Sequence, residues 1–550
     1  MTTPPFDRAE MLLRLENESF DVVVIGGGIT GVGVALDAAS RGLRTALIER
    51  DDFASGTSSK SSKLIHGGLR YLQQGEVRLV YEALHERRRL CHNAAHLVTV
   101  LPFMIPILTK DGVVSRKIAR ALGSAMWMYD LTGGWRIGKL HRRLRKKVAL
   151  AHLPTMPAER LASAYLYFDA AADDARLCLA VARTAAAHGA VVANRCAAVG
   201  LLTDSRGKAS GITIDTGARH IDVRANVVVN ACGVWADDTR ALSEAVHPDS
   251  IRPAKGVHIT VPWSKVRNDI AVVIPVPKDK RSLFVVPWGP LGDGTYRHTY
   301  IGTTDTDFDG DINDPQCTQD DIDYVLRALN FSVTTSVTQA DITGVWAGLR
   351  PLVKAAASGR TADLSRRHSI STNEAGLITV TGGKLTTYRE MAQDTVDVAE
   401  KALDVSHKCR TKNLALIGAD GYRPTTGPAA HLGSRYGTEA SLIQALITAE
   451  PELGQVLVDG LPYVRAEVIF AARYEMATTV DDILTRRTRA RLFDREASVL
   501  AAALVGELLG RELGLDINVV SDLVEAFVAD CAHEAAAGFM TDAQFLAASP

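Results

Sequence analysis

The sequence FDVVVIGGGITGVGVALDAASRGLRTALIERDDF, residues Phe20–Phe53, combines an unbroken apolar run with a cluster of glycines. Val22–Ile25 is apolar at every position, which predicts a strand buried on both faces of a parallel sheet. Gly26, Gly28 and Gly31 follow with the spacing G-x-G-x-x-G. In this fingerprint the first glycine allows a tight turn, the second lets a pyrophosphate approach the backbone, and the third allows close helix packing. The segment therefore predicts a helix whose amino end faces phosphate groups.

The residues after the fingerprint complete a β-α-β unit. The helix is expected to run to about Arg41 and to end at Gly42, and RTALIE returns as a second strand. Glu49 closes that strand where a ribose-binding carboxylate belongs, although a solvated strand-end acid is the simpler interpretation. The glycine motif alone is a weak signal, because glycine turns often serve packing. Strand, glycines, helix, strand and acid in this order predict dinucleotide binding.

The polar segment SGTSSKSSKLIHGG (Ser55–Gly68) bears on which dinucleotide is bound. The fingerprint itself fits NAD and FAD equally well. A loop rich in hydroxyls, backbone amides and glycines directly after the unit favours FAD, since the extended dinucleotide must be held along its whole length. We expect this segment to contact the pyrophosphate and the flavin.

Composition narrows the class of protein. The chain has 550 residues, which predicts two or three domains, and a net charge of -1 gives no support for nucleic-acid binding. Seven scattered cysteines show no metal-type spacing, so we expect reduced thiols in the cytosol and no metal. The N-terminal MTTPPFDRAEMLLRLENESF has no apolar core typical of a secretory or transit sequence. Leu97–Leu108, the longest apolar run, contains two prolines and is too short to span a bilayer.

Eight ordered blocks carry a family resemblance over nearly the whole chain. They are SSKLIHGGLRYL (61–72), FDAAADDARLCLA (168–180), VVVNACGVWADD (227–238), KGVHITVP (255–262), IGTTDTDFDGD (301–311), WAGLRPL (346–352), VTGGKLTTYREMA (380–392) and RYEMATTVDDILTRRTR (473–489). With the fingerprint, they resemble the FAD-dependent glycerol-3-phosphate dehydrogenases of the respiratory, aerobic type. Amino-acid and amine oxidases share the nucleotide-binding half, but LIHGGLRYL, AGLRPL and GGKLTTYR distinguish this chain from them.

The resemblance implies an α/β fold of the glutathione-reductase and D-amino-acid-oxidase type. We expect a doubly wound FAD-binding unit over residues 20–400, interleaved with a substrate cap built on an antiparallel sheet. The cap is placed mainly at about 75–165 and 245–365. An all-helical C-terminal domain is expected over 413–550, where EASVLAAALVGELLGREL and its neighbours show helical periodicity.

The resemblance also implies the reaction, the oxidation of sn-glycerol 3-phosphate to dihydroxyacetone phosphate with FAD as cofactor. Such a site needs cations for the phosphate and a group that takes the hydroxyl proton, while the flavin supplies the redox chemistry. Arg70 and Arg366 match the family's substrate arginines, and a guanidinium suits a phosphate. A surface salt bridge is the alternative for Arg70, and the match at Arg366 could shift to Arg367.

His258 is the first choice for the proton acceptor, because the ordinary pKa of an imidazole lies near the operating pH. A histidine on a strand is more often a structural donor, and Arg350 is the alternative group that polarises the C2 oxygen. The identity of the base stays open between these two residues. Tyr71 and Thr304 are expected to complete the pocket by hydrogen bonding.

Lys384 begins the helix of TGGKLTTYRE and is expected near both the substrate and the flavin, where it would stabilise negative charge. An ordinary helix start capped by a threonine is the compatible alternative. His66 could be read as a covalent flavin attachment, but the resemblance implies noncovalent FAD. The remaining expected FAD contacts are Thr57, Ser58, Ser62, Lys63, Leu64, His66, Gly67, Cys196, Gly233, Gly383, Leu385 and Thr386.

The segment RKIARALGSAMWMYDLTGGWRIGKLHRRLRKK (116–147) mixes Trp127, Tyr129 and Trp135 with many cations. This pattern suits a helix lying on lipid headgroups, although a solvated charged face over a buried helix gives the same pattern. The resemblance implies transfer of electrons to a membrane quinone. We therefore expect a cytoplasmic protein, peripheral on the inner face of the cell membrane, with homodimerisation left open. The rival functions are a glycerol-3-phosphate oxidase that uses O2 and a related FAD amine or amino-acid oxidoreductase.

Overall fold

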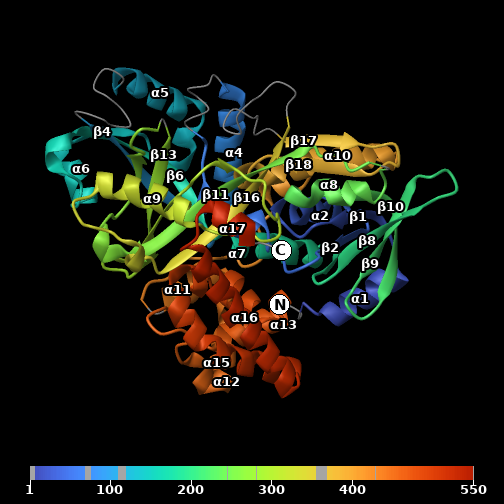
Figure 1. The fold of residues 1–550 in the computed structure, drawn as a ribbon. Coiled ribbons are helices and arrows are strands. Elements are labelled where there is room, and N and C mark those ends of the chain that lie inside the picture. Colours follow the sequence, from blue (N-terminus) through green and yellow to red (C-terminus); the bar gives the residue numbers. More distant parts are fainter. Residues whose placement is uncertain are drawn as a thin grey trace.

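The structure of the chain is a computed structural model. It describes residues 6–68, 76–108, 119–244, 246–279, 281–354, 368–427 and 429–548. Two sheets lie side by side above a group of helices formed by the C-terminal part of the chain (Figure 1).

The first sheet has eight strands and contains the predicted β-α-β unit. In spatial order its strands are β17 (His368–Thr372), β18 (Ile378–Gly382), β10 (His220–Asn230), β1 (Ser19–Ile25), β2 (Thr45–Ile48) and β7 (Val191–Ala193), with the β8 (Ala197–Thr203) and β9 (Ala209–Asp215) hairpin paired to β10. The strands from β18 to β7 are parallel to one another. Helices that pack against the sheet include α1 (Arg8–Asn17), α2 (Ile29–Arg41), α7 (Asp174–Ala187) and α10 (Tyr388–Ala402).

The fingerprint sits at the carboxyl end of β1. Val22, Val23 and Val24 are fully buried between parallel neighbours, as the unbroken apolar run predicts. A Cβ added to Gly31 would lie 1.9 Å from the carbonyl oxygen of Gly26. Helix α2 can therefore press onto the turn only because this position is glycine, and the amino end of the helix points past the sheet edge.

The second sheet has ten strands and is almost entirely antiparallel. In spatial order its strands are β15 (Thr306–Asp307), β11 (Ile251–Pro262), β14 (Tyr296–Gly302), β13 (Ser282–Pro290), β12 (Ala271–Pro275), β4 (Val98–Leu108), β6 (Leu161–Ala172) and β3 (Leu64–Ile65), with β16 (Gly344–Val353) on β11 and β5 (Arg142–Arg145) on β6. One face packs on α4 (Val77–Asn93) and α5 (Ala119–Thr132), and the other packs on α6 (Lys146–His152) and α9 (Gln319–Ser332). Successive side chains along each strand point to opposite faces of the sheet, so the apolar residues form two separate layers.

The C-terminal helices share a core of their own. They are α11 (Ala429–Tyr436), α12 (Ala440–Ala449), α13 (Ala466–Glu475), α14 (Ala490–Phe493), α15 (Arg495–Leu513), α16 (Ile517–Ala537) and α17 (Asp542–Ala548), with the π-helical turn η12 (Asp482–Arg487) between α13 and α14. The buried residues of this core include Phe470, Leu484 and Leu509. The expected combination of a parallel sheet, an antiparallel sheet and a C-terminal helical part is confirmed.

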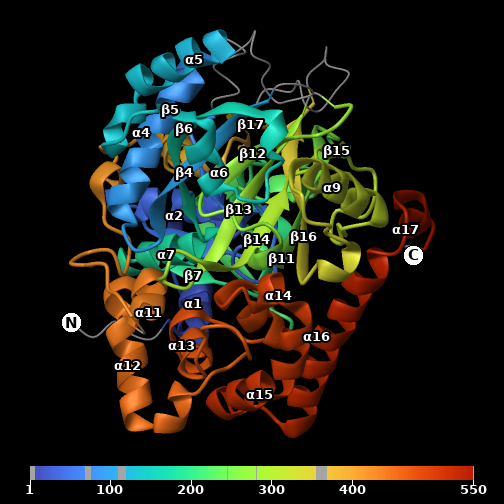
Figure 2. The same cartoon turned by 90° about the vertical axis from the view of Figure 1, so that its left-hand side faces the viewer.

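Helix α16 leads upward from the helical part, so that α17 lies beside α9 of the second sheet (Figure 2). There Asp542 accepts a hydrogen bond from Lys255 Nζ at 2.9 Å and from Thr318 Oγ1 at 2.8 Å. Lys255 is buried on β11 and also pairs with Asp321 at 2.7 Å. The end of the described chain thus neutralises a buried cation in the second sheet.

No helix within the described ranges combines the length and the apolar character needed to cross a membrane.

Glu467 gives the helical part a defined response to acid. It is fully buried on α13 and accepts hydrogen bonds from Tyr436 Oη at 2.7 Å and Val464 N at 2.9 Å, while His431 Nε2 lies 3.0 Å away. Burial alone would raise the pKa of this carboxyl, but His431, Arg435 and the Val464 N–H outweigh it and lower the pKa to about 2. The stabilisation is present above pH 4.5, the ordinary pKa of a glutamate, and is lost as the pH falls toward 2.

Glu467→Gln is therefore expected to lower the free energy of unfolding by about 3 kcal/mol at pH 7. Urea unfolding followed by circular dichroism at several pH values from 7 to about 3 checks this, because the difference from the wild type should shrink over the acid range. Glu452→Gln, at an exposed position of the same helical part, is the control. A difference that stays constant with pH would contradict the assigned role of the charge.

Candidate active site

A cavity of about 400 Å³ opens at the carboxyl ends of β1, β2 and β10. Its walls come from the start of α2, the segments that follow β2 and β10, and the β18–α10 connection, with Pro351 of β16 at one side. This is the crevice in which doubly wound sheets bind their ligands. The expected FAD contacts that line it are Gly26, Gly28, Glu49, Thr57, Ser58, Gly233, Gly383, Lys384 and Leu385.

Glu49 lies at the β2 end of the cavity, where a ribose is expected. Its Oε2 accepts a hydrogen bond from Gly27 N at 2.6 Å and its Oε1 accepts one from Asp51 N at 2.8 Å. Burial raises the pKa of Glu49 to about 7, although these two N–H groups oppose the shift. The carboxyl is thus held in place by two backbone N–H groups at the wall of the cavity.

The amino end of α2 forms the middle of the cavity. Gly28 is the N-cap and has no side chain to cap the helix, and Ser58 Oγ accepts the hydrogen bond from Ile29 N at 2.9 Å instead. Ser58 belongs to the short 3-10 helix η1 (Thr57–Ser59), which follows β2. The positive end of the helix dipole and nearby hydroxyls therefore face the position at which a pyrophosphate would bind.

The β18–α10 connection forms the far end of the cavity. Gly382 and Gly383 have φ angles of +75° and +76°, a conformation that favours glycine. Lys384 and Leu385 line the cavity, and the 3-10 helix η8 (Leu385–Thr387) leads into α10. Thr386 Oγ1 accepts a hydrogen bond from His66 N at 3.2 Å, so this residue links two segments instead of lining the cavity. The start of a second helix therefore faces the end of the site opposite Glu49.

The cavity fits FAD on these structural grounds. It offers a strand-end carboxyl, the amino end of α2, and a glycine-rich helix start in the order in which ribose, pyrophosphate and flavin follow one another. FAD would be held by Glu49 at its ribose and by residues near Gly28 and Ser58 at its pyrophosphate. The flavin would lie near Gly383, Lys384 and Leu385.

Several expected contacts lie behind the cavity wall. Leu64 is buried on β3 of the second sheet, and the buried Gly67 donates from its N–H to Asp169 Oδ1 at 3.1 Å. Cys196 is buried behind Glu49, and its N–H donates to the Glu49 carbonyl at 2.7 Å. Gly31 packs under the turn. These residues support the wall, and direct contact between any of them and FAD stays a prediction.

Lys63 is buried, and its Nζ lies 4.4 Å from the ring centroid of Trp346 and 3.4 Å from Asp174 Oδ1. Burial lowers the pKa of Lys63 to about 8, with Arg489 adding to the shift and Asp174 opposing it. The ammonium is therefore already engaged by protein groups on two sides.

His258 on β11 is buried and stacks on Trp346 of the neighbouring strand, with ring centroids 4.7 Å apart. Its Nε2 lies 2.9 Å from Ser62 Oγ, and its Nδ1 has no hydrogen-bond partner among the described residues. Burial, followed by the positive charges of Lys63 and Arg350, holds the pKa of His258 well below its usual range. The imidazole is thus neutral at physiological pH, which is the form that a general base requires.

Arg350 lies on β16, next to Pro351, which lines the cavity. Its guanidinium donates to Asp305 Oδ1 at 3.0 Å, to Thr303 Oγ1 at 3.1 Å and to the Thr304 carbonyl at 3.1 Å. The Thr304 hydroxyl accepts a hydrogen bond from Val257 N at 2.9 Å, beside His258. The segment after β14 therefore connects Arg350 to the strand that carries His258.

Arg70, Tyr71 and Arg366 lie outside the described residues. The expectation that they bind the substrate is unchanged by the structure. Sequence reasoning missed several cavity residues, among them Arg50 and Trp235. The Arg50 guanidinium lies 5.0 Å from the Trp235 ring, and both side chains donate to Asn313 Oδ1. Their positions in the sequence, one residue after Glu49 and two residues after Gly233, are the signal that could have found them.

The expectation that the aromatic residues of segment 116–147 face lipid headgroups is wrong for Tyr129. Its side chain is only 1% exposed, and its hydroxyl donates to Asp169 Oδ1 at 2.6 Å. It belongs to the apolar layer between α5 and the second sheet and does not face lipid headgroups.

Comparison with known proteins supports the sequence resemblance. The family described as "FAD dependent oxidoreductase" matches residues 21–389, and "C-terminal domain of alpha-glycerophosphate oxidase" matches residues 409–519. Glycerol-3-phosphate dehydrogenase 2 of Mycobacterium tuberculosis is 41% identical over 93% of this chain and 88% of its own length. The mitochondrial glycerol-3-phosphate dehydrogenase of Homo sapiens is 37% identical over 93% of this chain and 73% of its own length.

A crystal structure of the glycerol-3-phosphate dehydrogenase from Bacillus halodurans, complexed with FAD, superposes with a TM-score of 0.75. It is 28% identical and covers 96% of this chain and 97% of its own. The α-glycerophosphate oxidase of Mycoplasma pneumoniae shares the fold, with a TM-score of 0.55 at 17% identity over 72% of this chain and 97% of its own. This chain belongs to the FAD-dependent glycerol-3-phosphate dehydrogenase family.

Proposed function

We propose that the protein oxidises sn-glycerol 3-phosphate to dihydroxyacetone phosphate and passes the electrons to a membrane quinone. The observation that carries the proposal is that Arg350 precedes Pro351 of the cavity wall, on a strand paired with the strand that carries neutral His258. Relatives that are 41% and 37% identical to this chain carry the name glycerol-3-phosphate dehydrogenase.

The side chains have complementary roles in this proposal. FAD, when bound, supplies the two-electron redox chemistry. His258 accepts the proton of the C2 hydroxyl at Nδ1, and Arg350, oriented by Asp305 and the Thr303–Thr304 segment, polarises the C2 oxygen. Arg70 and Arg366 bind the phosphate, Tyr71 and Thr304 complete the pocket, and Lys384 favours negative charge at the flavin end.

Anaerobic reduction of the bound flavin tests the substrate. Purified protein is expected to be yellow and to bleach when sn-glycerol 3-phosphate is added, whereas glycerol at the same concentration leaves the spectrum unchanged because it lacks the phosphate. A flavin that remains oxidised with glycerol 3-phosphate, or one that bleaches equally with glycerol, contradicts the assignment.

The electron acceptor is tested separately, because a dehydrogenase and an oxidase of glycerol 3-phosphate differ only in whether the reduced flavin passes its electrons to a quinone or to O2. We expect rapid reduction of a water-soluble quinone and little hydrogen peroxide in aerated buffer. Stoichiometric peroxide with slow quinone reduction would favour the oxidase.

The exposed surface of α5 and of the 3-10 helix η2 (Gly134–Ile137), which follows it, supports attachment to the inner face of the membrane. Trp127, Leu131 and Trp135 are 57%, 75% and 52% exposed. A basic exposed stretch, Arg142–Lys147, follows in the chain. Interfacial segments combine such apolar and cationic side chains.

Trp127→Ser/Leu131→Ser is expected to reduce co-sedimentation with vesicles of phosphatidylglycerol and phosphatidylcholine while the flavin spectrum stays unchanged. The control is Leu500→Ser, at an exposed position on α15. Equal vesicle binding by all three proteins would contradict a membrane role for α5.

A further inference from the structure

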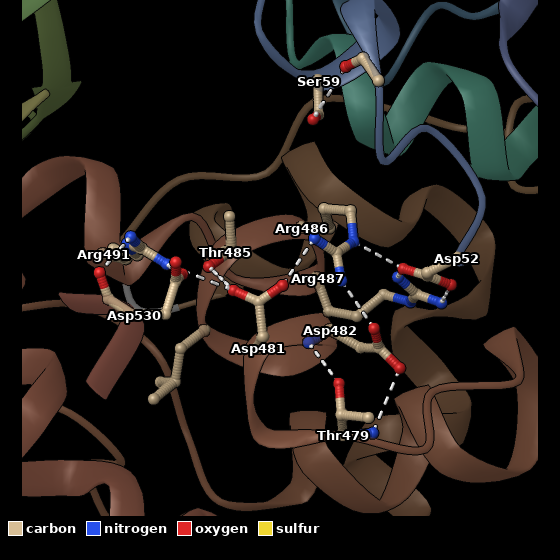
Figure 3. Close-up of polar contacts among 12 residues, drawn as sticks. Asp52, Ser59, Thr479, Asp481, Asp482, Thr485, Arg486, Arg487, Arg491 and Asp530 are labelled. Carbon is tan, nitrogen blue, oxygen red and sulfur yellow. Dashed lines mark hydrogen bonds and ion pairs between the residues drawn. The ribbon is translucent and has the colours of Figure 1, made fainter. Parts of the chain in front are cut away.

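Three basic residues of the C-terminal helical part reach into the FAD-binding unit. Arg486 and Arg487 end the π-helical turn η12, and Arg489 follows two residues later. We name these three residues the arginine clamp. All three are buried, although arginine is rarely buried without a specific partner. Figure 3 shows Arg486 and Arg487 converging on Asp52, a residue of the FAD-binding unit.

Asp52 is the first attachment point of the arginine clamp. It is fully buried, and Arg487 binds it through two parallel hydrogen bonds, from Nη1 to Oδ2 at 2.6 Å and from Nη2 to Oδ1 at 2.8 Å. Arg486 Nε donates to the same Oδ2 at 2.6 Å. Bidentate pairs of this kind fix geometry as well as charge. Asp52 stands three residues after Glu49, at the beginning of a cavity wall.

The second attachment point lies at the other end of that wall. Arg489 Nη2 donates to the Ser59 carbonyl at 3.0 Å and to Asp174 Oδ1. Asp174 Oδ2 in turn accepts hydrogen bonds from Ser61 N at 3.0 Å and Ser61 Oγ at 2.7 Å. The φ angle of Arg489 is +72°, which side chains with a Cβ rarely adopt. This turn of the backbone aims the guanidinium at Ser59 and Asp174.

The residues between the two attachment points form the cavity wall itself. Ser55, Gly56, Thr57 and Ser58 all line the 400 Å³ cavity. Ser58 Oγ accepts the hydrogen bond of the first turn of α2, and Thr57 Oγ1 donates to the Leu349 carbonyl at 2.6 Å. The wall is therefore held at both ends by Arg487 and Arg489, which lie more than 300 residues after their partners Asp52 and Asp174 in the sequence.

We propose that Arg486, Arg487 and Arg489 are positioning residues that hold segment 52–61 in the conformation required for tight FAD binding. The inference rests on the proposed assignment of the cavity to FAD. It gives the C-terminal helical part a role in cofactor retention. Without the arginine clamp, segment 52–61 is no longer held at its two ends. FAD binding must then also order this segment, which adds an entropic cost to the free energy of binding.

Arg486 and Arg487 have partners in the helical part as well as Asp52, so the contact with Asp52 can be removed separately. Arg486 also pairs with Asp481 at 2.7 Å and Asp482 at 2.5 Å, and Arg487 Nη2 also donates to the Glu475 carbonyl at 2.7 Å. Asp52→Asn therefore removes the carboxylate from the FAD-binding unit while both arginines keep partners in their own helical part. This variant is expected to fold, because it leaves no arginine without a partner.

The experiment titrates apoprotein with FAD and follows the change in FAD fluorescence. Asp52→Asn and Arg489→Gln are each expected to raise the Kd for FAD about tenfold or more, with amide hydrogen exchange over residues 52–61 accelerated. Arg487→Lys keeps the charge but not the bidentate geometry, and should give a Kd between those of the wild type and Arg487→Gln.

Arg491→Gln is the matched control. Arg491 is equally buried, but its partners Asp481, Asp530 and Glu534 all belong to the helical part. This variant should lose thermal stability and keep the wild-type Kd and exchange rates over 52–61. The proposal is overturned if Asp52→Asn binds FAD with wild-type affinity, or if Arg491→Gln weakens FAD as much as Asp52→Asn does. A wild-type protein that binds no FAD would instead refute the proposed function.

Discussion

Replacing Arg350 by lysine is expected to lower kcat for the oxidation of sn-glycerol 3-phosphate by about a hundred- to a thousandfold. The guanidinium plane is fixed by Asp305, the Thr303 hydroxyl and the Thr304 carbonyl. Lysine supplies the same charge as a point on a flexible stem and cannot reproduce these directions. In the proposed mechanism Arg350 polarises the C2 oxygen more strongly in the transition state than in the ground state, so the loss should appear in kcat more than in KM.

Steady-state kinetics with an artificial quinone, together with the flavin spectrum of the variant, measures this effect. Arg252→Lys is the matched control, because Arg252 lies on the neighbouring strand β11 and pairs with Asp307 at 2.6 Å near the surface. An Arg350→Lys variant with unchanged kcat and a raised KM would show that Arg350 only binds the substrate.

His258→Asn is expected to lower kcat by about a hundred- to ten-thousandfold, the usual contribution of a positioned general base. Asparagine is smaller than histidine and can replace the imidazole that packs directly against Gly302, where an added Cβ would lie 2.2 Å from the ring. It cannot accept the hydroxyl proton. FAD binding should persist, because His258 does not line the cavity of about 400 Å³.

The pH profile of kcat separates the base from a structural histidine. Because the pKa of His258 is held well below 6.5, its ordinary value, the residue stays neutral as the pH falls through 6.5. The wild-type kcat should therefore stay flat through this range. His298→Asn, on β14 of the same sheet and packed on Phe493, is the control and should retain activity. Similar losses in both variants would contradict the role of His258.

The first β-α-β unit could be predicted because its signals are local. Val22–Ile25 lies within β1, and the helix ends at Arg41, as the apolar run and Gly42 indicate. The strand-end position of Glu49 also followed from short-range spacing. These features depend on steric and hydrogen-bonding requirements within a few residues of chain.

The course of residues 59–68 could not be predicted in the same way. The polar composition suggested contact with FAD over the whole segment, yet Leu64 and Ile65 leave the cavity to pair with Ala171 and Ala170 of β6. Likewise, the RRTR sequence of the arginine clamp resembles a solvated basic face. Its partners Asp52 and Asp174 become visible only when residues far apart in the chain are brought together.

The contact between Lys255 and Asp542 has a consequence for biosynthesis. Asp542 leaves the ribosome 287 residues after Lys255, which belongs to the same strand as His258. Until Asp542 has been synthesised, Asp321 is the only one of these two carboxylates that can pair with the Lys255 ammonium. The strand that carries the proposed base therefore reaches its final electrostatic environment late, and a nascent chain should mature into active enzyme only after the distal helices have emerged.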